Sequence, residues 1–404
     1  MSESAAVQPG NDEEANLPWR DWILLPAFSL LTISLLVGST ELIARLMLPK
    51  TRTSGEDCMV FNDPSTGVRG IPNSVCWERI PESGELTEYR FNSCGYRADM
   101  QCGSKPPGTY RIVMMGTSVA IGMRVPIEKT FAALLPSELS RRTGRNVEIY
   151  NEAMPWRPPH VLALHFGDVL TAKPDMVLWI LTPIDIERTS WEMSRDSMDD
   201  TRSLSFPARA LRHMKAIFAV KTSTAAITEI FNQTRTALLL RHFLYRSKSQ
   251  YVKSSLTGAD EEERFLRAES SAEWGSRLKE LDRDAADIED RAKAAGIPLV
   301  AVLVPNRAQA AMISMGEWPV DFDPYKLDAE LRSIIVNHGG IYINILSDFR
   351  AIPSPEQGYF PVDGHPNAQG HAMITGILAK ALTSGAIPSL RVAGQPQTAF
   401  EQSR

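Results

Sequence analysis

The sequence predicts an α/β fold with a central parallel sheet, because apolar runs of strand length alternate with amphipathic helical patterns from Tyr110 onward. The runs expected to form strands are 110–116, 147–151, 176–182, 297–304 and 341–345. The helical patterns fall near 127–143, 158–172, 277–295, 324–338 and 367–383. Alternation of this kind predicts helices on both faces of the sheet. Ligands of such folds bind at the carboxyl ends of the strands.

A long helical insertion is expected between the third and fourth strands, at about 190–276. It could cap the site or pack beside it, and it offers a surface for a protein partner. The helix that follows carries one continuous apolar stripe, formed by Trp274, Leu278, Leu281, Ala285, Ile288 and Ala292. We expect this stripe to pack on the sheet, with a coiled-coil dimer as the alternative.

Composition is that of an ordinary globular chain, with 404 residues, 43% of them hydrophobic and 23% charged. The length suits one large domain or two modest ones. A net charge of −5 gives no electrostatic reason to expect nucleic-acid binding. We therefore look for the function in particular residues and not in the overall charge.

One segment near the amino terminus differs from the rest of the chain. The run from Trp22 to Thr40 is uncharged and long enough to cross a hydrocarbon core of roughly 30 Å as a helix. A cleaved signal peptide is the alternative, but a polar, acidic stretch precedes the run and no clean cleavage site follows it. We expect a single transmembrane helix that anchors the chain in a membrane.

Two features of the sequence predict opposite orientations of this anchor in the membrane. Arg45, Lys50 and Arg52 follow the span, and the positive-inside rule alone would place the main domain in the cytoplasm. The four cysteines argue for an oxidising compartment, because they are even in number and clustered just after the anchor: Cys58, Cys76, Cys94 and Cys102. A zinc site is the alternative, but no Cys-x-x-Cys pair and no nearby histidine supports it. We favour two disulfides, a bacterial inner-membrane anchor and a periplasmic domain.

These features divide the chain into five parts. They are a disordered acidic tail (1–17), the transmembrane anchor (18–48), a Cys-rich collar (51–108), the α/β domain (109–385) and a flexible tail (386–404). The function is expected in the fourth part.

Two short motifs in the α/β domain carry chemistry-bearing residues. Ser118 follows the first strand as Gly116-Thr117-Ser118, and Asp363-Gly364-His365 enters the last helical pattern. Serine is a weak nucleophile until a base removes its proton, and a histidine held by a carboxylate is a common base. Each motif alone also fits a simple turn. Together they predict a site in which Ser118, His365 and Asp363 are the catalytic residues, with no metal and no cofactor.

The motifs resemble those of the SGNH, or GDSL-like, hydrolase superfamily in its membrane-anchored bacterial form. The resemblance covers about 90–385 and is carried by five stretches, Asn92-Ser93-Cys94-Gly95-Tyr96-Arg97, Arg111-Ile112-Val113-Met114-Met115-Gly116-Thr117-Ser118, Tyr150-Asn151-Glu152-Ala153-Met154-Pro155, Pro174-Asp175-Met176-Val177 with Asp185-Ile186, and Asp363-Gly364-His365-Pro366-Asn367. It implies a flavodoxin-like three-layer sandwich with about five parallel strands. It also implies acyl-ester chemistry at Ser118.

The chain departs from the family pattern at the oxyanion hole. The family uses the serine N–H, a glycine N–H and an asparagine side chain, and this sequence has Ala153 and Ile184 at the latter two positions. Alanine keeps the backbone donor, so Ser118 and Ala153 are the expected oxyanion hole. Isoleucine cannot donate, and Asn151 is a neighbouring polar residue that could compensate. Asp185 and Arg307 are further candidates for lining the site, since each follows the end of a predicted strand.

Two classes of function remain open at this stage. One is a membrane-anchored, extracytoplasmic acyl esterase or O-acyltransferase that acts on a cell-envelope glycan or glycolipid. The other keeps the fold without the activity, as a glycan-binding or assembly subunit of a membrane complex. A nucleotide-binding protein is excluded, because no glycine-rich phosphate loop follows the first strand.

Overall fold

The structure is a computed structural model that describes residues 18–47, 54–63, 67–187, 234–257 and 261–392. Its core is a five-stranded sheet in the order β6-β5-β7-β8-β9, and every neighbouring pair is parallel. The strands are β5 (Thr109–Gly116), β6 (Asn146–Asn151), β7 (Met176–Leu181), β8 (Leu299–Leu303) and β9 (Ile341–Ile343). Each run predicted as a strand forms one of them. The order is that of a flavodoxin-like sheet, so the topological switch point lies at the carboxyl end of β5.

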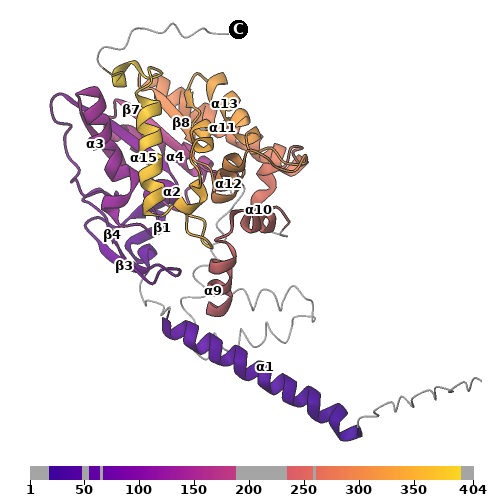
Figure 1. The fold of residues 1–404 in the computed structure, drawn as a ribbon. Coiled ribbons are helices and arrows are strands. Elements are labelled where there is room, and N and C mark those ends of the chain that lie inside the picture. The colour runs from indigo at the N-terminus through magenta and orange to yellow at the C-terminus, as the bar shows by residue number, and fades with distance from the viewer. Residues whose placement is uncertain (1–17, 48–53, 64–66, 188–233, 258–260, 393–404) are drawn as a thin grey trace, which may run out of the picture.

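The helices pack in groups around this sheet (Figure 1). Helix α3 (Phe131–Thr143) packs on α15 (Ala368–Leu382), while α4 (Pro159–Thr171) packs on α11 (Ala272–Ala294), which also contacts α13 (Lys326–Asn337). The predicted stripe of α11 is largely buried, with Trp274, Leu281, Ala285, Ile288 and Ala292 inside the protein. The stripe therefore packs within the domain, as expected.

Several short elements connect the larger ones. Two 3-10 helices lie inside ranges predicted as helical, η2 (Ile127–Lys129) in 127–143 and η3 (Glu261–Leu266) in the insertion. The others were not predicted, namely α2 (Ser118–Ile121), α5 (Pro183–Glu187), α12 (Arg307–Met315), α14 (Leu346–Arg350) and the 3-10 helices η4 (Pro355–Gly358) and η5 (Pro388–Leu390). Helix α12 is buried along most of its length, so it has no polar face to produce an amphipathic pattern.

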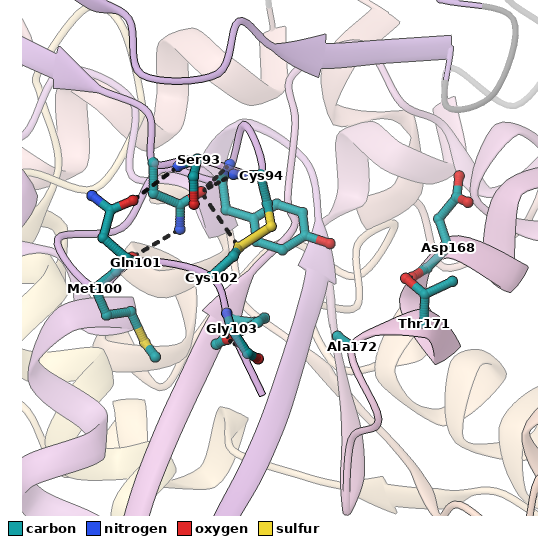
Figure 2. The surroundings of a disulfide bond; sticks show 12 residues. Ser93, Cys94, Met100, Gln101, Cys102, Gly103, Asp168, Thr171 and Ala172 are labelled. Carbon is teal, nitrogen blue, oxygen red and sulfur yellow. Dashed lines mark hydrogen bonds between the residues drawn. A yellow bond between two sulfur atoms is a disulfide. The ribbon is translucent and has the colours of Figure 1, made fainter. Parts of the chain in front are cut away.

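The segment between the apolar helix and the sheet forms two small antiparallel hairpins. The first pairs β1 (Met59–Asp63), after η1 (Gly55–Cys58), with β2 (Gly67–Gly70), and the second pairs β3 (Val75–Arg79) with β4 (Leu86–Arg90). Two disulfides, Cys58–Cys76 and Cys94–Cys102, hold the segment together. Figure 2 shows the second disulfide, which closes a turn that the Asn92 side chain also stabilises by donating to the Met100 carbonyl at 2.9 Å.

Three helices lie outside the sheet and the helices that cover it (Figure 1). Helix α1 (Trp19–Met47) is the one helix among the described residues that is long and apolar enough to cross a membrane, and it extends away from the rest of the protein (Figure 1). Helices α9 (Arg235–Leu244) and α10 (Lys248–Thr257) belong to the predicted insertion, as do η3 and the start of α11. The Glu41 carboxylate of α1 accepts hydrogen bonds from the backbone N–H groups of Arg235 and Thr236, at 3.1 and 2.9 Å. The first turn of α9 therefore contacts α1.

The predicted carboxyl-terminal boundary of the folded domain is wrong, and two other predicted segments concern residues outside the described ranges. The predicted flexible tail was placed too early, because Ile387 and Leu390 are buried and Ser389 Oγ lies 2.8 Å from the hydroxyl of Tyr110. These apolar side chains extend the folded domain beyond residue 386. The predicted acidic tail (1–17) and much of the predicted insertion (188–233) lie outside the described residues.

Candidate active site

Ser118 is placed by a sharp turn at the end of β5. Gly116 has a φ of 150°, and a Cβ on it would lie 2.6 Å from the Ile180 carbonyl oxygen of β7. Only glycine fits this close approach. Thr117 then caps α2, and Ser118 is its first residue. The Ser118 N–H therefore belongs to a first helical turn, where no intrahelical acceptor exists.

The structure brings Ser118, His365 and Asp363 together. His365 Nε2 lies 2.8 Å from Ser118 Oγ, and His365 Nδ1 lies 2.7 Å from Asp363 Oδ1. An ionised carboxylate only accepts, so Nδ1 carries the imidazole proton and Nε2 is left as the acceptor for the serine hydroxyl. The three side chains have the nucleophile–base–carboxylate geometry of a serine hydrolase.

Two cavities meet at Ser118 and His365. The first measures about 190 Å³ and lies toward α10 and α12, lined by Val119, Thr182, Pro183, Ile184, Glu187, Tyr251, Val304, Pro305, Asn306, Arg307, Tyr359, Val362 and Gly364. The second measures about 240 Å³ and lies toward the collar, lined by Glu56, Thr117, Met123, Arg124, Pro155, Trp156, Arg157, Pro158, Ile184 and Asp185. The serine hydroxyl can thus meet groups that approach from two sides.

The expected oxyanion hole is only partly provided. The Ala153 N–H is directed at Asn151 Oδ1, 3.2 Å away, and Asn151 Nδ2 donates to the Ala120 carbonyl at 3.0 Å. Asn151 is buried and lines neither cavity, so its amide supplies no donor to the site. Ile184 lines both cavities and presents an apolar side chain where the family has its third donor.

Asp185 lines the second cavity, but its carboxylate is engaged in local hydrogen bonds. It accepts from the Thr117 hydroxyl at 2.5 Å, and from the Thr182 N–H and hydroxyl at 2.7 and 2.8 Å. The Thr117 hydroxyl therefore donates to a carboxylate on α5. This buried pair ties α5 to the turn that carries the nucleophile.

Arg307 lines the first cavity, and its donors are directed at backbone carbonyls. It donates to Glu356 at 3.3 Å and to Pro361 at 2.6 Å, and it also contacts the carbonyl of Tyr245. Its guanidinium lies 3.7 Å from the ring centroid of Tyr251 on α10. Arg307 thus fastens the segment before Asp363 to the helical insertion, and the insertion contributes the Tyr251 wall of the cavity.

Three further residues contact the loops that carry the site and were not identified from the sequence. Arg97 is buried and donates to the carbonyls of Ile121 and Val125 at 3.0 and 2.7 Å, which fixes the loop after α2. Arg124, in that loop, forms an ion pair with Asp363 Oδ2. Glu82 accepts from the backbone of the Asp363 loop. The sequence offers a signal for Arg97, because this residue ends the Asn-Ser-x-Gly-Tyr-Arg phrase. It offers none for Arg124 or Glu82.

Among the residues that the structure describes, no group of three or more His, Cys, Asp or Glu side chains is placed to hold a metal ion.

The sheet order, with Ser118 after the first strand of the sheet and Asp363 and His365 before the last long helix, is that of an SGNH-hydrolase-like α/β fold. No family model matches the chain, and no curated protein matches it.

Structural similarity is found with several solved proteins, esterases among them, at low sequence identity. One is TesA, at 11% identity and a TM-score of 0.37, with 68% of this chain and 98% of TesA covered. Another is the psychrotrophic esterase EstA from Pseudoalteromonas sp., at 10% and 0.34, with 68% and 97% covered. A third is a variant of the acetyl-xylooligosaccharide esterase Axe2 from a Geobacillus species, at 11% and 0.38, with 74% and 100% covered.

Proposed function

We propose that the protein is a membrane-anchored, extracytoplasmic serine acyl esterase or O-acyltransferase that acts on a cell-envelope glycan or glycolipid. The observation that carries the proposal is the chain of hydrogen bonds from Ser118 through His365 to Asp363, at the point where two cavities meet. A hydrogen-bonded serine, histidine and carboxylate at the switch point of a parallel sheet is suited to acyl transfer.

The reaction begins when Ser118 Oγ attacks the acyl carbonyl carbon and its proton passes to His365 Nε2. Asp363 stabilises the imidazolium that forms. The N–H groups of Ser118 and Ala153 face the developing oxyanion, for which Ala153 must release Asn151 Oδ1. The carbon–oxygen bond to the leaving alcohol then breaks, the alcohol takes the proton from His365, and the acyl group remains on Ser118.

The second half of the reaction returns the enzyme to its starting state. Water or a sugar hydroxyl attacks the acyl-serine carbonyl and gives its proton to His365. Ser118 Oγ leaves and takes that proton back. Hydrolysis and transfer differ only in this acceptor. With one cavity on each side of Ser118, the acyl group and the alcohol can occupy opposite sides.

The membrane location in this proposal is supported by α1 and by the disulfides. Helix α1 has the length and composition of a membrane span, and its side chains between Trp22 and Thr40 are exposed. Disulfides form and persist in oxidising compartments, and both disulfides lie in the collar that follows α1. A tethered enzyme meets envelope-bound substrates more readily than diffusible ones.

A second candidate is a glycan-binding or assembly subunit that keeps the fold without turnover. It is favoured by Ile184, which removes one oxyanion donor, and by the Ala153 N–H, which is already bonded to Asn151. Loss of one such donor costs about 10²–10³ in rate, or roughly 3–4 kcal/mol. That cost slows acyl transfer but does not abolish it.

The deciding experiment measures aryl-acetate hydrolysis and fluorophosphonate labelling by the full-length protein in detergent. We expect both in the wild type and neither in Ser118→Ala, while Ser137→Ala serves as a control because Ser137 is exposed on α3. His365→Ala should lose turnover as well. A folded wild type that shows neither turnover nor labelling of Ser118 would establish the second candidate instead.

A further inference from the structure

Glu82 connects the collar to the loop that carries Asp363. It lies in the turn between β3 and β4, and its side chain is only 2% exposed. Its Oε1 accepts hydrogen bonds from the backbone N–H groups of Val362 and Asp363, at 3.0 and 2.7 Å. A buried carboxylate needs such partners, and here two consecutive backbone N–H groups supply them.

The second oxygen of the same carboxylate also accepts from the Val362 N–H, at 3.1 Å, and it faces the helical insertion. Glu82 Oε2 lies 3.1 Å from His242 Nδ1 on α9, and the first turn of α9 is held by Glu41 of α1. One carboxylate therefore joins three segments that are far apart in sequence, namely the collar hairpin, the α9 helix and the Asp363 loop. The loop is held from outside the sheet domain as well as from within it.

The loop between η4 and α15 has hydrogen bonds of its own as well as these external contacts. Inside the loop, the Phe360 N–H donates to the His365 carbonyl at 2.9 Å, and Gly364 has a φ of 81°. Glycine leaves this backbone more conformational freedom than other residues would. Asp363 must stay aligned with His365 Nδ1, because an error of about 1 Å in a catalytic arrangement can cost 10²-fold in rate.

We infer that Glu82 is a positioning residue, which fixes Asp363 and thereby His365 through the backbone N–H groups of Val362 and Asp363. The inference rests on the function proposed above for Ser118, His365 and Asp363. Glu82 touches no substrate, because it lines neither cavity. Its effect is therefore expected on the rate of the chemical step and not on substrate binding.

The test compares Glu82→Ala, Glu82→Asp and Glu82→Gln in the full-length protein, with Glu85→Gln as the matched control in the same turn, where Glu85 is exposed. Glu82→Ala should lower kcat by about 10–100-fold and leave KM within about twofold. Glu82→Asp keeps the negative charge, but its shorter side chain draws the carboxylate away from the N–H groups of Val362 and Asp363. We therefore expect kcat to fall in this variant as well.

The Glu82→Gln variant tests whether Glu82 acts by accepting the hydrogen bonds of the loop or by its negative charge. A glutamine oxygen can accept both loop N–H groups, as Oε1 does now, and its NH₂ can face His242 Nδ1. Glu82→Gln should therefore keep kcat within about threefold of the wild type. Double variants with His242→Ala should be non-additive in kcat, because the two side chains share one contact.

Hydrogen exchange provides a readout that does not depend on activity. In Glu82→Ala the amides of Val362 and Asp363 should exchange about tenfold faster or more, and in Glu82→Gln they should exchange as in the wild type. Unchanged exchange in Glu82→Ala and Glu82→Asp would overturn the inference. So would a kcat within about threefold of the wild type in both variants, or equal losses of kcat in Glu82→Gln and Glu82→Ala.

Failure of the proposed function would be recognised separately. It would appear as a wild type without Ser118-dependent turnover or labelling. The exchange measurement would still decide whether Glu82 positions the loop. If Glu82→Ala does not fold, Glu82→Asp and Glu82→Gln carry the comparison.

Discussion

Arg124 and His365 share the carboxylate of Asp363. His365 Nδ1 lies 2.7 Å from Oδ1, and the Arg124 guanidinium forms an ion pair with Oδ2. Arg124 has a φ of 63°, its N–H donates to the Tyr89 hydroxyl at 2.7 Å, and it lines the cavity toward the collar. A strained backbone at the wall of a cavity is found most often at functional sites. We infer that Arg124 holds the Asp363 carboxylate in its orientation toward His365.

Replacement of Arg124 by asparagine should slow the enzyme without unfolding it. Asparagine tolerates the left-handed backbone conformation but removes the positive charge beside Asp363. We expect Arg124→Asn to lower kcat by about tenfold or more, with little change in melting temperature. Steady-state kinetics and a thermal melt test this, with Arg141→Asn as the control because the Arg141 side chain is 68% exposed. An unchanged kcat in Arg124→Asn would remove Arg124 from the catalytic arrangement.

Introduction of an amide at position 184 should raise activity. Ile184 stands where the family has its third oxyanion donor, and it lines both cavities beside Ser118. One such donor is worth about 10²–10³ in rate when its geometry is good, so Ile184→Asn should raise kcat for aryl acetate by tenfold or more. Ile184→Val, which changes shape without adding a donor, is the control. Equal activity of the asparagine and valine variants would show that the oxyanion is held elsewhere.

The sheet and the position of the serine could be predicted because their signals are local. The strands are continuous apolar runs, and Ser118 directly follows one of them, at the edge where parallel strands present their carboxyl ends. His365 and Asp363 lie three and five residues before α15, whose amphipathic pattern marked the start of the helix. The order of the strands in the sheet then brings Ser118, His365 and Asp363 together.

The remaining features depend on contacts that no spacing in the sequence reveals. Glu82 and Asp363 belong to segments that are far apart in the chain, as do Arg124 and Asp363, so neither pair forms a motif. Helix α12 is buried on nearly all sides and shows no amphipathic period. The end of the domain was misplaced because Ile387 and Leu390 are isolated apolar residues in a segment with no regular pattern.

Loss of the Asp185 carboxylate should destabilise the fold. It accepts from the Thr117 hydroxyl and from the N–H and hydroxyl of Thr182, and all three residues are buried. Asp185→Ala leaves these donors without their acceptor, which should lower the free energy of unfolding by about 2–4 kcal/mol. Urea unfolding measures the loss, and Asp287→Ala on the exposed side of α11, where the Asp287 side chain is 52% exposed, is the control. A loss equal to that of the control would mean that water replaces these bonds.

Acid should destabilise the protein through His371. Burial, with smaller contributions from Arg97 and His365, lowers the pKa of His371 from 6.5 to about 3, and its Nδ1 accepts the Phe131 N–H at 3.1 Å. Between these two pKa values the unfolded chain binds a proton that the folded protein excludes. The stability is thus complete above pH 6.5 and falls as the pH drops, by up to about 1.4 kcal/mol per pH unit.

Asparagine at this position isolates the contribution of the imidazole. An asparagine oxygen can replace Nδ1 as the acceptor for the Phe131 N–H but does not titrate. Urea unfolding across the acid range should therefore show a shallower dependence on pH in His371→Asn than in the wild type. Parallel slopes in His371→Asn and the wild type would show that His371 is protonated in the folded protein, and that Phe131 has another acceptor.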